Sequence, residues 1–174
     1  MEAGPPDPLR EVAAQDPNAA ELLKVLAHFA SRPIPLELVD AALPEASAQE
    51  RKDALAALAG LGAVELGDGT VAVAADLAAA VRGSLPEQVL DGARLVGELL
   101  LASFPADPAD PANWPAAGRL HPHLVQIADL GGLDSESASL SVLLARGSEY
   151  SRVRGDLEAA EAMARRALSS CPPG

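Results

Sequence analysis

The sequence predicts a mainly α-helical protein with one small β-hairpin, and three observations support this fold class. The chain of 174 residues is 49% hydrophobic, yet it contains only two phenylalanines, one tryptophan and one tyrosine. Its core must therefore be built largely from leucine, valine and alanine, and alanine is the strongest helix former. Apolar residues recur at helical spacing between prolines, and only one short segment has the pattern of a β-hairpin.

The N-terminal residues 1–17 are predicted to be a flexible arm, because prolines are frequent there and few residues are large and apolar. The first helix is expected to follow Asn18, a residue type favoured at the N-cap, and to run through the segment AAELLKVLAHFA. It should end by Ser31, since Arg32 precedes Pro33 and is pushed out of the helical conformation.

Two further helices are expected next. A short extended link at residues 33–35 leads into a second helix at residues 36–43. Ser47 and Glu50 then form a capping-box pattern, in which each side chain bonds the backbone N–H of the other, and this pattern opens a third helix.

The clearest β signal lies at residues 63–66 and 70–73, which flank the loop Gly67-Asp68-Gly69. Asp76 is expected to cap the helix that follows. Three helices followed by a two-stranded hairpin is the order of elements in a winged helix. Residues 18–83 are therefore predicted to form a winged-helix-like domain.

Residues 84–133 are predicted to be a helical connector that contains a proline-rich loop. A long helix should begin at Pro86, a residue favoured in the first turn, and end near Ser103. The prolines of the next segment, FPADPADPANWP, are spaced too closely for a regular element to persist. A further helix is expected from Trp114 to Leu130, ended by two glycines.

Residues 134–174 have the spacing of one tetratricopeptide-like helical hairpin. Gly155 suits the turn between two helices and Asp156 suits the N-cap of the second, while Ser148 takes a place where the repeat prefers glycine. A single repeat cannot bury its own apolar face, so we expect this face to pack against another surface. The positions that match the repeat are Tyr150, Gly155, Ala160, Ala167 and Pro172.

The connector is the most distinctive stretch: a Phe-Pro pair, two Asp-Pro pairs, then Trp-Pro and a histidine before leucine. Together with the segment LLKVLAHFASRPIPLELV and the hairpin, it resembles the winged-helix and tetratricopeptide-repeat portion of actinobacterial signalling NTPases of the STAND/NB-ARC type. The likeness covers residues 18–172. The resemblance implies a regulatory segment that couples a nucleotide-binding module to a sensor array.

The sequence departs from that family in lacking its nucleotide-binding domain. No GxxxxGK[ST] phosphate loop occurs, so this chain cannot cradle a triphosphate in the way that those NTPases do. In the family a phosphate-sensing histidine follows the hairpin, whereas the matching positions here are Ala74 and Ala75, followed by Asp76 and Leu77. We therefore expect no cofactor and no ATP hydrolysis by this chain alone.

The charge balance argues against nucleic acids and anionic membranes as partners. The 13 basic and 25 acidic residues give a net charge of −12, whereas both kinds of partner require neutralisation by Lys and Arg. The predicted third helix offers only Arg51 and Lys52 for a DNA backbone. Cys171 is the only cysteine, which favours a reducing, cytoplasmic setting, and no apolar run reaches the length of a membrane span.

No residues form a convincing catalytic or metal-binding pattern, so we expect a protein that is not an enzyme. His121 and His123 flank a proline, and no third ligand lies at a suggestive spacing. No serine lies in a GxSxG elbow, and the paired acids of the loops suit solvated carboxylates and helix N-termini.

The predicted function is that of a non-enzymatic protein–protein interaction or regulatory module. We expect the open face of the C-terminal hairpin to bind a protein partner, or a second copy of the chain to form a homodimer. The predicted protein-binding residues are Trp114, Tyr150, Arg152, Arg154, Arg166 and Leu168.

Two alternatives remain open at this point. The arginines of the hairpin can form an ordinary solvated face, paired with glutamates one turn away, instead of a docking surface. The protein can also be a small-molecule-binding or enzyme-accessory protein, with a pocket between its two parts. The residues that would line this pocket are Trp114, His121, His123 and Tyr150.

Overall fold

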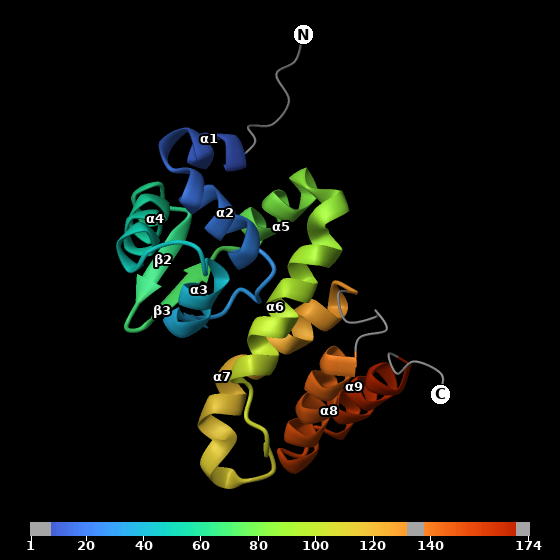
Figure 1. Ribbon diagram of the computed structural model, residues 1–174. Coiled ribbons are helices and arrows are strands. Elements are labelled where there is room, and N and C mark those ends of the chain that lie inside the picture. The colour runs from blue at the N-terminus through green and yellow to red at the C-terminus, as the bar shows by residue number, and fades with distance from the viewer. Residues whose placement is uncertain (1–7, 132–137, 170–174) are drawn as a thin grey trace. The chain divides into compact units, whose positions relative to one another are not determined.

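The computed structural model describes residues 8–131 and 138–169 (Figure 1). Most of these residues are helical and a small antiparallel sheet accompanies them, which confirms the predicted mainly α-helical fold class. The chain divides into two compact units, residues 1–89 and 90–174.

The first unit combines helices with a three-stranded sheet. From α2 onward its elements follow the order helix, strand, helix, helix and hairpin, so the unit is winged-helix-like. In chain order they are α1 (Pro8–Gln15), α2 (Pro17–Leu26), β1 (Ile34–Pro35), α3 (Leu36–Ala42), α4 (Ala48–Gly60), β2 (Val64–Gly67), β3 (Thr70–Val73), α5 (Ala75–Ser84) and the 3-10 helix η1 (Pro86–Gln88).

The N-terminal segment is the first correction to the sequence analysis. The predicted flexible arm is wrong over residues 8–15, which form α1; residues 1–7 lie outside the described part of the chain. Leu9 and Val12 lie one turn apart on α1 and are both buried where this helix contacts α2. The burial of these two apolar residues at helical spacing accounts for a helix in this segment.

Helix α2 begins at Pro17, two residues earlier than predicted, because Asp16 and not Asn18 caps it. The Asp16 carboxylate accepts hydrogen bonds from the backbone N–H groups of Asn18 (2.8 Å) and Ala19 (3.2 Å). Pro17 occupies the first helical position, where its missing N–H leaves no bond unmade. The helix ends at Leu26, inside the predicted limit.

The sheet is antiparallel with strand order β1-β3-β2. The predicted extended link supplies β1, in which Ile34 pairs with Val71 of β3. The hairpin is tighter than expected: Gly67 pairs with Thr70, so the turn has two residues and not three. Gly69 in this turn has φ +66°, a conformation that glycine adopts without strain.

The other two predicted helix caps of this unit, at α4 and α5, have different outcomes. The capping box at α4 is confirmed: the Ser47 hydroxyl accepts from the Glu50 N–H at 3.2 Å, and the Glu50 carboxylate accepts from the Ser47 N–H at 2.7 Å. At α5 the N-cap is Ala74, which makes no side-chain bond. Asp76 lies inside the first turn, so its predicted role as the cap is wrong.

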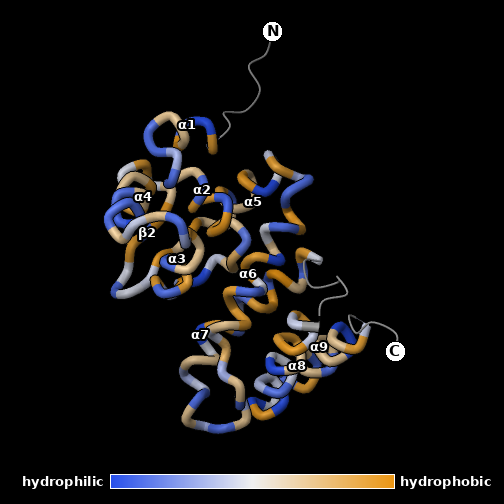
Figure 2. Tube along the Cα trace, in the orientation of Figure 1, coloured by the Kyte–Doolittle hydropathy of each residue, from blue (hydrophilic) through white to orange (hydrophobic). Residues whose placement is uncertain are grey.

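The core of the first unit is built from aliphatic side chains, as the composition requires. Apolar segments of the trace alternate with polar ones along each helix (Figure 2). Near the end of α2, Arg82 of α5 donates a hydrogen bond to the Ala27 carbonyl, and the His28 ring bonds the Lys24 carbonyl at 2.8 Å. Fully buried members of this core include Leu22, Leu23, Leu26, Phe29, Ile34, Leu38, Leu58 and Val71.

All the regular elements in the described part of the second unit are helices. The long helix predicted from Pro86 divides into η1 and α6, and the proline-rich loop contains the 3-10 helix η2, capped by the Asp110 carboxylate on the Ala112 N–H at 2.9 Å. Phe104 is buried at the start of this loop. The elements are α6 (Val89–Ser103), η2 (Pro111–Asn113), α7 (Trp114–Asp129), α8 (Ala138–Val153) and α9 (Leu157–Ser169).

Helices α8 and α9 form a hairpin and lie side by side (Figure 1). The predicted turn between them is confirmed: Gly155 has φ +84°, and the Asp156 carboxylate accepts from the Ala159 N–H at 3.1 Å. This short turn brings the two helices together, so each shields part of the other.

Helices α7, α8 and α9 pack closely at Gly147, one residue before Ser148, the position that matches the glycine of the repeat. A Cβ atom on Gly147 would lie 2.2 Å from Leu124 Cδ2 of α7 and 2.9 Å from Met163 Sδ of α9. The Ser148 hydroxyl instead donates a hydrogen bond to the Ala160 carbonyl at 2.7 Å. The three helices therefore meet where α8 has no side chain.

Candidate protein-interaction site

The four aromatic residues divide into two classes by burial. Phe29 and Phe104 are core residues, with exposed fractions of 2% and 3%. Trp114 and Tyr150 are only partly buried, and both belong to the second unit, at the start of α7 and on α8. In a protein with so few aromatic side chains, these two are the large rings available to a partner.

Trp114 carries an arginine over its ring. The guanidinium carbon of Arg154 lies 4.8 Å from the centroid of the Trp114 ring, a cation–π distance. Arg154 is exposed, and the indole Nε1 of Trp114 makes no hydrogen bond within the described residues although this atom is buried. The pair therefore offers an apolar ring and a positive charge at one place.

Tyr150 joins the same region through His121. The ring centroids of Tyr150 and His121 lie 5.2 Å apart at an angle of 50°, and His121 Nε2 lies 2.8 Å from the hydroxyl of Ser151. Gly118 permits this approach of α8 to α7, because a Cβ atom there would lie 2.8 Å from the Tyr150 hydroxyl. We call Trp114, His121, Tyr150, Ser151 and Arg154 the aromatic–arginine cluster.

The electrostatics of the cluster favour an uncharged histidine. Burial lowers the pKa of His121 below its ordinary value of 6.5, and the opposing effect of the Asp156 carboxylate is smaller. Neutral His121 bonded to Ser151 leaves Arg154 as the charged group of the cluster. Ser151 is buried, so the histidine–serine contact holds α7 to α8 and does not present a nucleophile.

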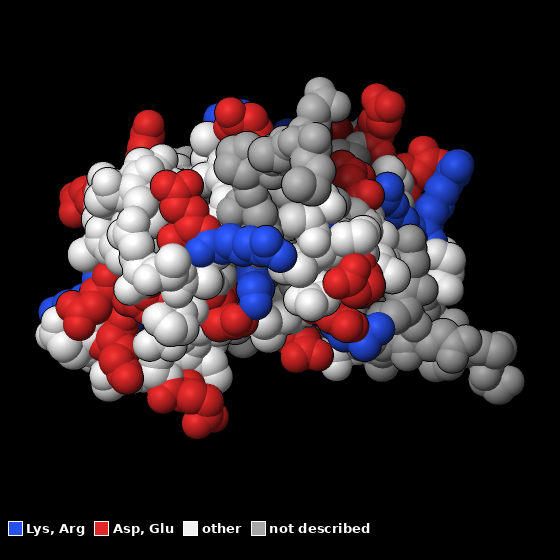
Figure 3. All heavy atoms as spheres, turned by 90° about the horizontal axis from the view of Figure 1, so that it is seen from above, with Lys and Arg blue, Asp and Glu red and all other residues white. Residues whose placement is uncertain are grey.

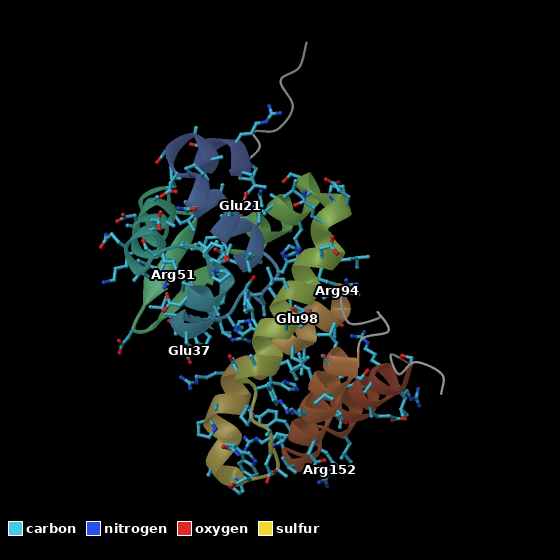
Figure 4. The ribbon with its side chains drawn as sticks, viewed as in Figure 1. Glu21, Glu37, Arg51, Arg94, Glu98 and Arg152 are labelled. Atoms are coloured by element: carbon cyan, nitrogen blue, oxygen red, sulfur yellow. The ribbon has the colours of Figure 1, made fainter. Side chains whose placement is uncertain are left out.

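The other arginines of the hairpin are paired within the chain. Arg152 at the end of α8 (Figure 4) donates to both carboxylate oxygens of Glu149, at 2.9 and 2.6 Å, and this pairing lowers the pKa of Glu149. The described contacts thus fit the alternative of a solvated, ion-paired face. The remaining acceptors are Glu161 for Arg165, Asp129 for Arg166, and the carbonyls of Leu101 and Phe104 for Arg146.

The six predicted binding residues therefore lie in three environments. Trp114 contacts Arg154, and Tyr150 contacts His121 and accepts a backbone hydrogen bond from Arg154, so these three residues belong to the cluster. Arg152 is held by Glu149. Arg166 and Leu168 lie on α9, where Leu168 is 75% exposed. Sequence spacing did not foresee the contact between His121 and Ser151, since thirty residues separate them.

The proposed pocket residues all belong to α7 and α8 of the second unit. His123 is fully buried, so the hypothesis that it lines an open pocket is wrong. His121 already bonds Ser151, and among the described residues no group of three His, Cys, Asp or Glu side chains is placed to hold a metal ion.

The α4 helix has the place of a recognition helix in the winged-helix order, but its arginine is engaged. Arg51 (Figure 4) donates to the carbonyls of Leu43, at 3.2 Å, and Ala46, and its Nε lies 3.3 Å from Asp40. Acidic side chains are scattered over the face shown in Figure 3. These contacts leave Lys52 as the exposed basic residue of α4.

Comparisons with protein-family models, with curated proteins and with solved structures found no match to this chain. None of the helices in the described segments combines the length and the apolar character that a membrane span needs.

Proposed function

We propose that this chain is a non-enzymatic protein-interaction module whose contact site is the aromatic–arginine cluster. The observation that carries the proposal is the stacking of exposed Arg154 on partly exposed Trp114, beside Tyr150. Trp, Tyr and Arg are the residue types enriched at the energetic centres of protein interfaces. Rings that are already ordered lose little conformational entropy when a partner binds.

The chemistry of the cluster indicates the kind of partner. An apolar side chain on the partner would cover the Trp114 ring, and a carboxylate would pair with Arg154. The other arginines of the hairpin already have acceptors, so they contribute less. A phosphate backbone is a poor fit, because the chain carries a net charge of −12.

The role suggested by the resemblance is regulation. A winged-helix-like unit followed by a tetratricopeptide-like hairpin would couple the nucleotide-binding module of a signalling NTPase to its sensor. The cluster on α7 and α8 would then be where the hairpin contacts that machinery. The reducing interior of a cell is the setting that this role requires.

The test is quantitative affinity capture from a lysate of the source organism. The purified chain and its Trp114→Ala and Arg154→Ala variants serve as baits, and Arg94→Ala, an exposed arginine of α6 (Figure 4), is the matched control. We expect the same proteins on the wild type and on Arg94→Ala, reduced about tenfold on Trp114→Ala, which corresponds to about 1.4 kcal/mol at an interface centre.

Circular dichroism of each bait establishes that it is folded. If folded Trp114→Ala retains the same proteins in the same amounts as the wild type, the cluster is not the contact site. The proposal then fails.

A further inference from the structure

Helix α9 carries two exposed leucines that nothing in the described chain covers. Leu157 is 67% exposed and Leu168 is 75% exposed, whereas Ala160 and Met163 on the same helix are buried against the hairpin. A helix turns about 100° per residue, so residues eleven apart differ in direction by only about 20° and lie three turns apart. The two leucines therefore lie on one edge of α9, with the partly exposed Ala164 between them.

The two flanks of this leucine edge differ. On the flank toward the buried face lie the small residues Ala160 and Ala167. On the solvent flank lie Glu158, Glu161 and Arg165, with the acidic residues in the first half of the helix and the basic one in the second. Glu161 and Arg165 form an exposed ion pair at 2.5 Å.

This arrangement is complementary to itself when a second helix runs in the opposite direction. In an antiparallel pair related by a two-fold axis, the charged flanks of both helices lie on one side of the interface and the alanine flanks lie on the other. Leu157 of each copy then lies opposite Leu168 of the other copy. In that register Arg165 of one copy lies level with residue 160 of the other copy. It therefore lies between Glu158 and Glu161 of that other copy. Both contacts occur twice, because the pairing has two-fold symmetry.

A parallel arrangement lacks this match. It would set the charged flank of one helix against the alanine flank of the other, so Arg165 would face no carboxylate of the second copy. The antiparallel orientation alone brings Arg165 next to Glu158 and Glu161 across the interface, so the charge order of α9 favours that orientation.

We propose that α9 pairs antiparallel with α9 of a second copy of this chain, through the edge formed by Leu157, Ala164 and Leu168. The inference goes beyond the proposed function, because it concerns a different surface from the aromatic–arginine cluster. A single helix face buries less area than the standard protein interface, so we expect a weak dimer that dissociates on dilution.

Sedimentation velocity of the full chain over a range of concentrations is the first test. We expect the weight-average mass to rise from monomer toward dimer with concentration. Leu168→Glu should raise the dissociation constant at least about tenfold, because it places a charge in the apolar edge. Val142→Glu, which alters an exposed apolar residue of α8, is the matched control and should behave as the wild type.

Charge reversal tests the orientation. Glu158→Arg with Glu161→Arg makes the flank wholly basic, and Arg165→Glu makes it wholly acidic. We expect each variant alone to dimerise less than the wild type, and an equimolar mixture to recover a heterodimer. Recovery on mixing cannot be explained by poor folding of either variant.

Cysteine cross-linking supplies a second readout, in a Cys171→Ser background. Leu157→Cys and Leu168→Cys should form a disulfide with one another when mixed, and little with themselves. Self-cross-linking of Leu157→Cys alone would indicate a parallel pair and overturn the proposal. A wild-type chain that stays monomeric at all concentrations would also overturn it, whereas the proposed function fails only if capture is independent of Trp114.

Discussion

Replacing Gly147 by alanine tests how closely the three helices of the second unit are packed. The new Cβ atom would lie 2.2 Å from Leu124 Cδ2 and 2.9 Å from Met163 Sδ, both shorter than van der Waals contact. Leu124 has no exposed surface and Met163 is 5% exposed, so neither side chain can swing into solvent. The helices must separate slightly, or both side chains must leave their preferred rotamers.

Two effects of opposite sign set the magnitude. Adding a methyl group to a closely packed core costs about 1–3 kcal/mol. Alanine in place of glycine inside a helix stabilises the folded state by about 0.5–1 kcal/mol. We therefore expect the free energy of unfolding of the second unit to fall by about 1–2 kcal/mol, which lowers the melting temperature of a domain of this size by about 5–10 °C.

Differential scanning calorimetry of the full chain measures this change. The control is Gly83→Ala in α5, where a Cβ atom would meet nothing within 4 Å. Gly83→Ala introduces no close contact and only raises the helix propensity, so it should increase the free energy of unfolding of the first unit by about 0.5–1 kcal/mol. An unchanged or higher melting temperature for Gly147→Ala would show that Leu124 and Met163 repack without cost, and the reasoning about this contact would be wrong.

Two other predictions concern pH and nucleic acid. Burial lowers the pKa of His28 from its ordinary value of 6.5, so below that pH the unfolded chain binds a proton that the folded chain does not. Stability should be constant above about pH 7 and fall as the pH drops, measured by urea unfolding, and His28→Gln should reduce the fall. A steeper fall in that variant would contradict the assignment. In a mobility-shift assay at low salt, the chain should not shift duplex DNA; a shift that is lost in Lys52→Ala would instead identify α4 as a recognition helix.

Local signals in the sequence predicted the elements that depend on neighbours in the chain. The capping box at Ser47 and Glu50 and the turn at Gly155 and Asp156 are each complete within a few residues, and both are confirmed. The hairpin was predicted for the same reason, although its turn proved shorter because Gly67 pairs with Thr70.

Elements that depend on distant contacts were predicted less well. Strand β1 has only two residues and becomes a strand because β3, more than thirty residues later, pairs with it. Helix α1 packs against α2, and the burial of Leu9 and Val12 stabilises it. The sequence could have distinguished Asp16 from Asn18 as the N-cap. Both residue types cap well, but Pro17 suits the first position of a helix and so favours Asp16 as the cap.

The candidate site illustrates the same limit for charge. The sequence left two interpretations of the hairpin arginines open, a docking surface and a solvated face paired with glutamates one turn away, and the ion pair of Arg152 with Glu149 fits the second. Counting charges by segment therefore overestimates what a partner can reach. Arg154 is distinguished by stacking on Trp114, a contact across forty residues that no spacing rule predicts.

The two surfaces proposed here for binding rest on different physical grounds. A singly exposed leucine is ordinary on a soluble protein and needs no explanation. Leu157 and Leu168 differ because they share one edge of α9 and because the charges beside them match only when a second copy runs antiparallel. The cluster instead has ordered rings and one cation, which suit a partner of different chemistry. Variants at Trp114 should therefore leave self-association unchanged, and variants at Leu168 should weaken self-association even where the cluster is intact.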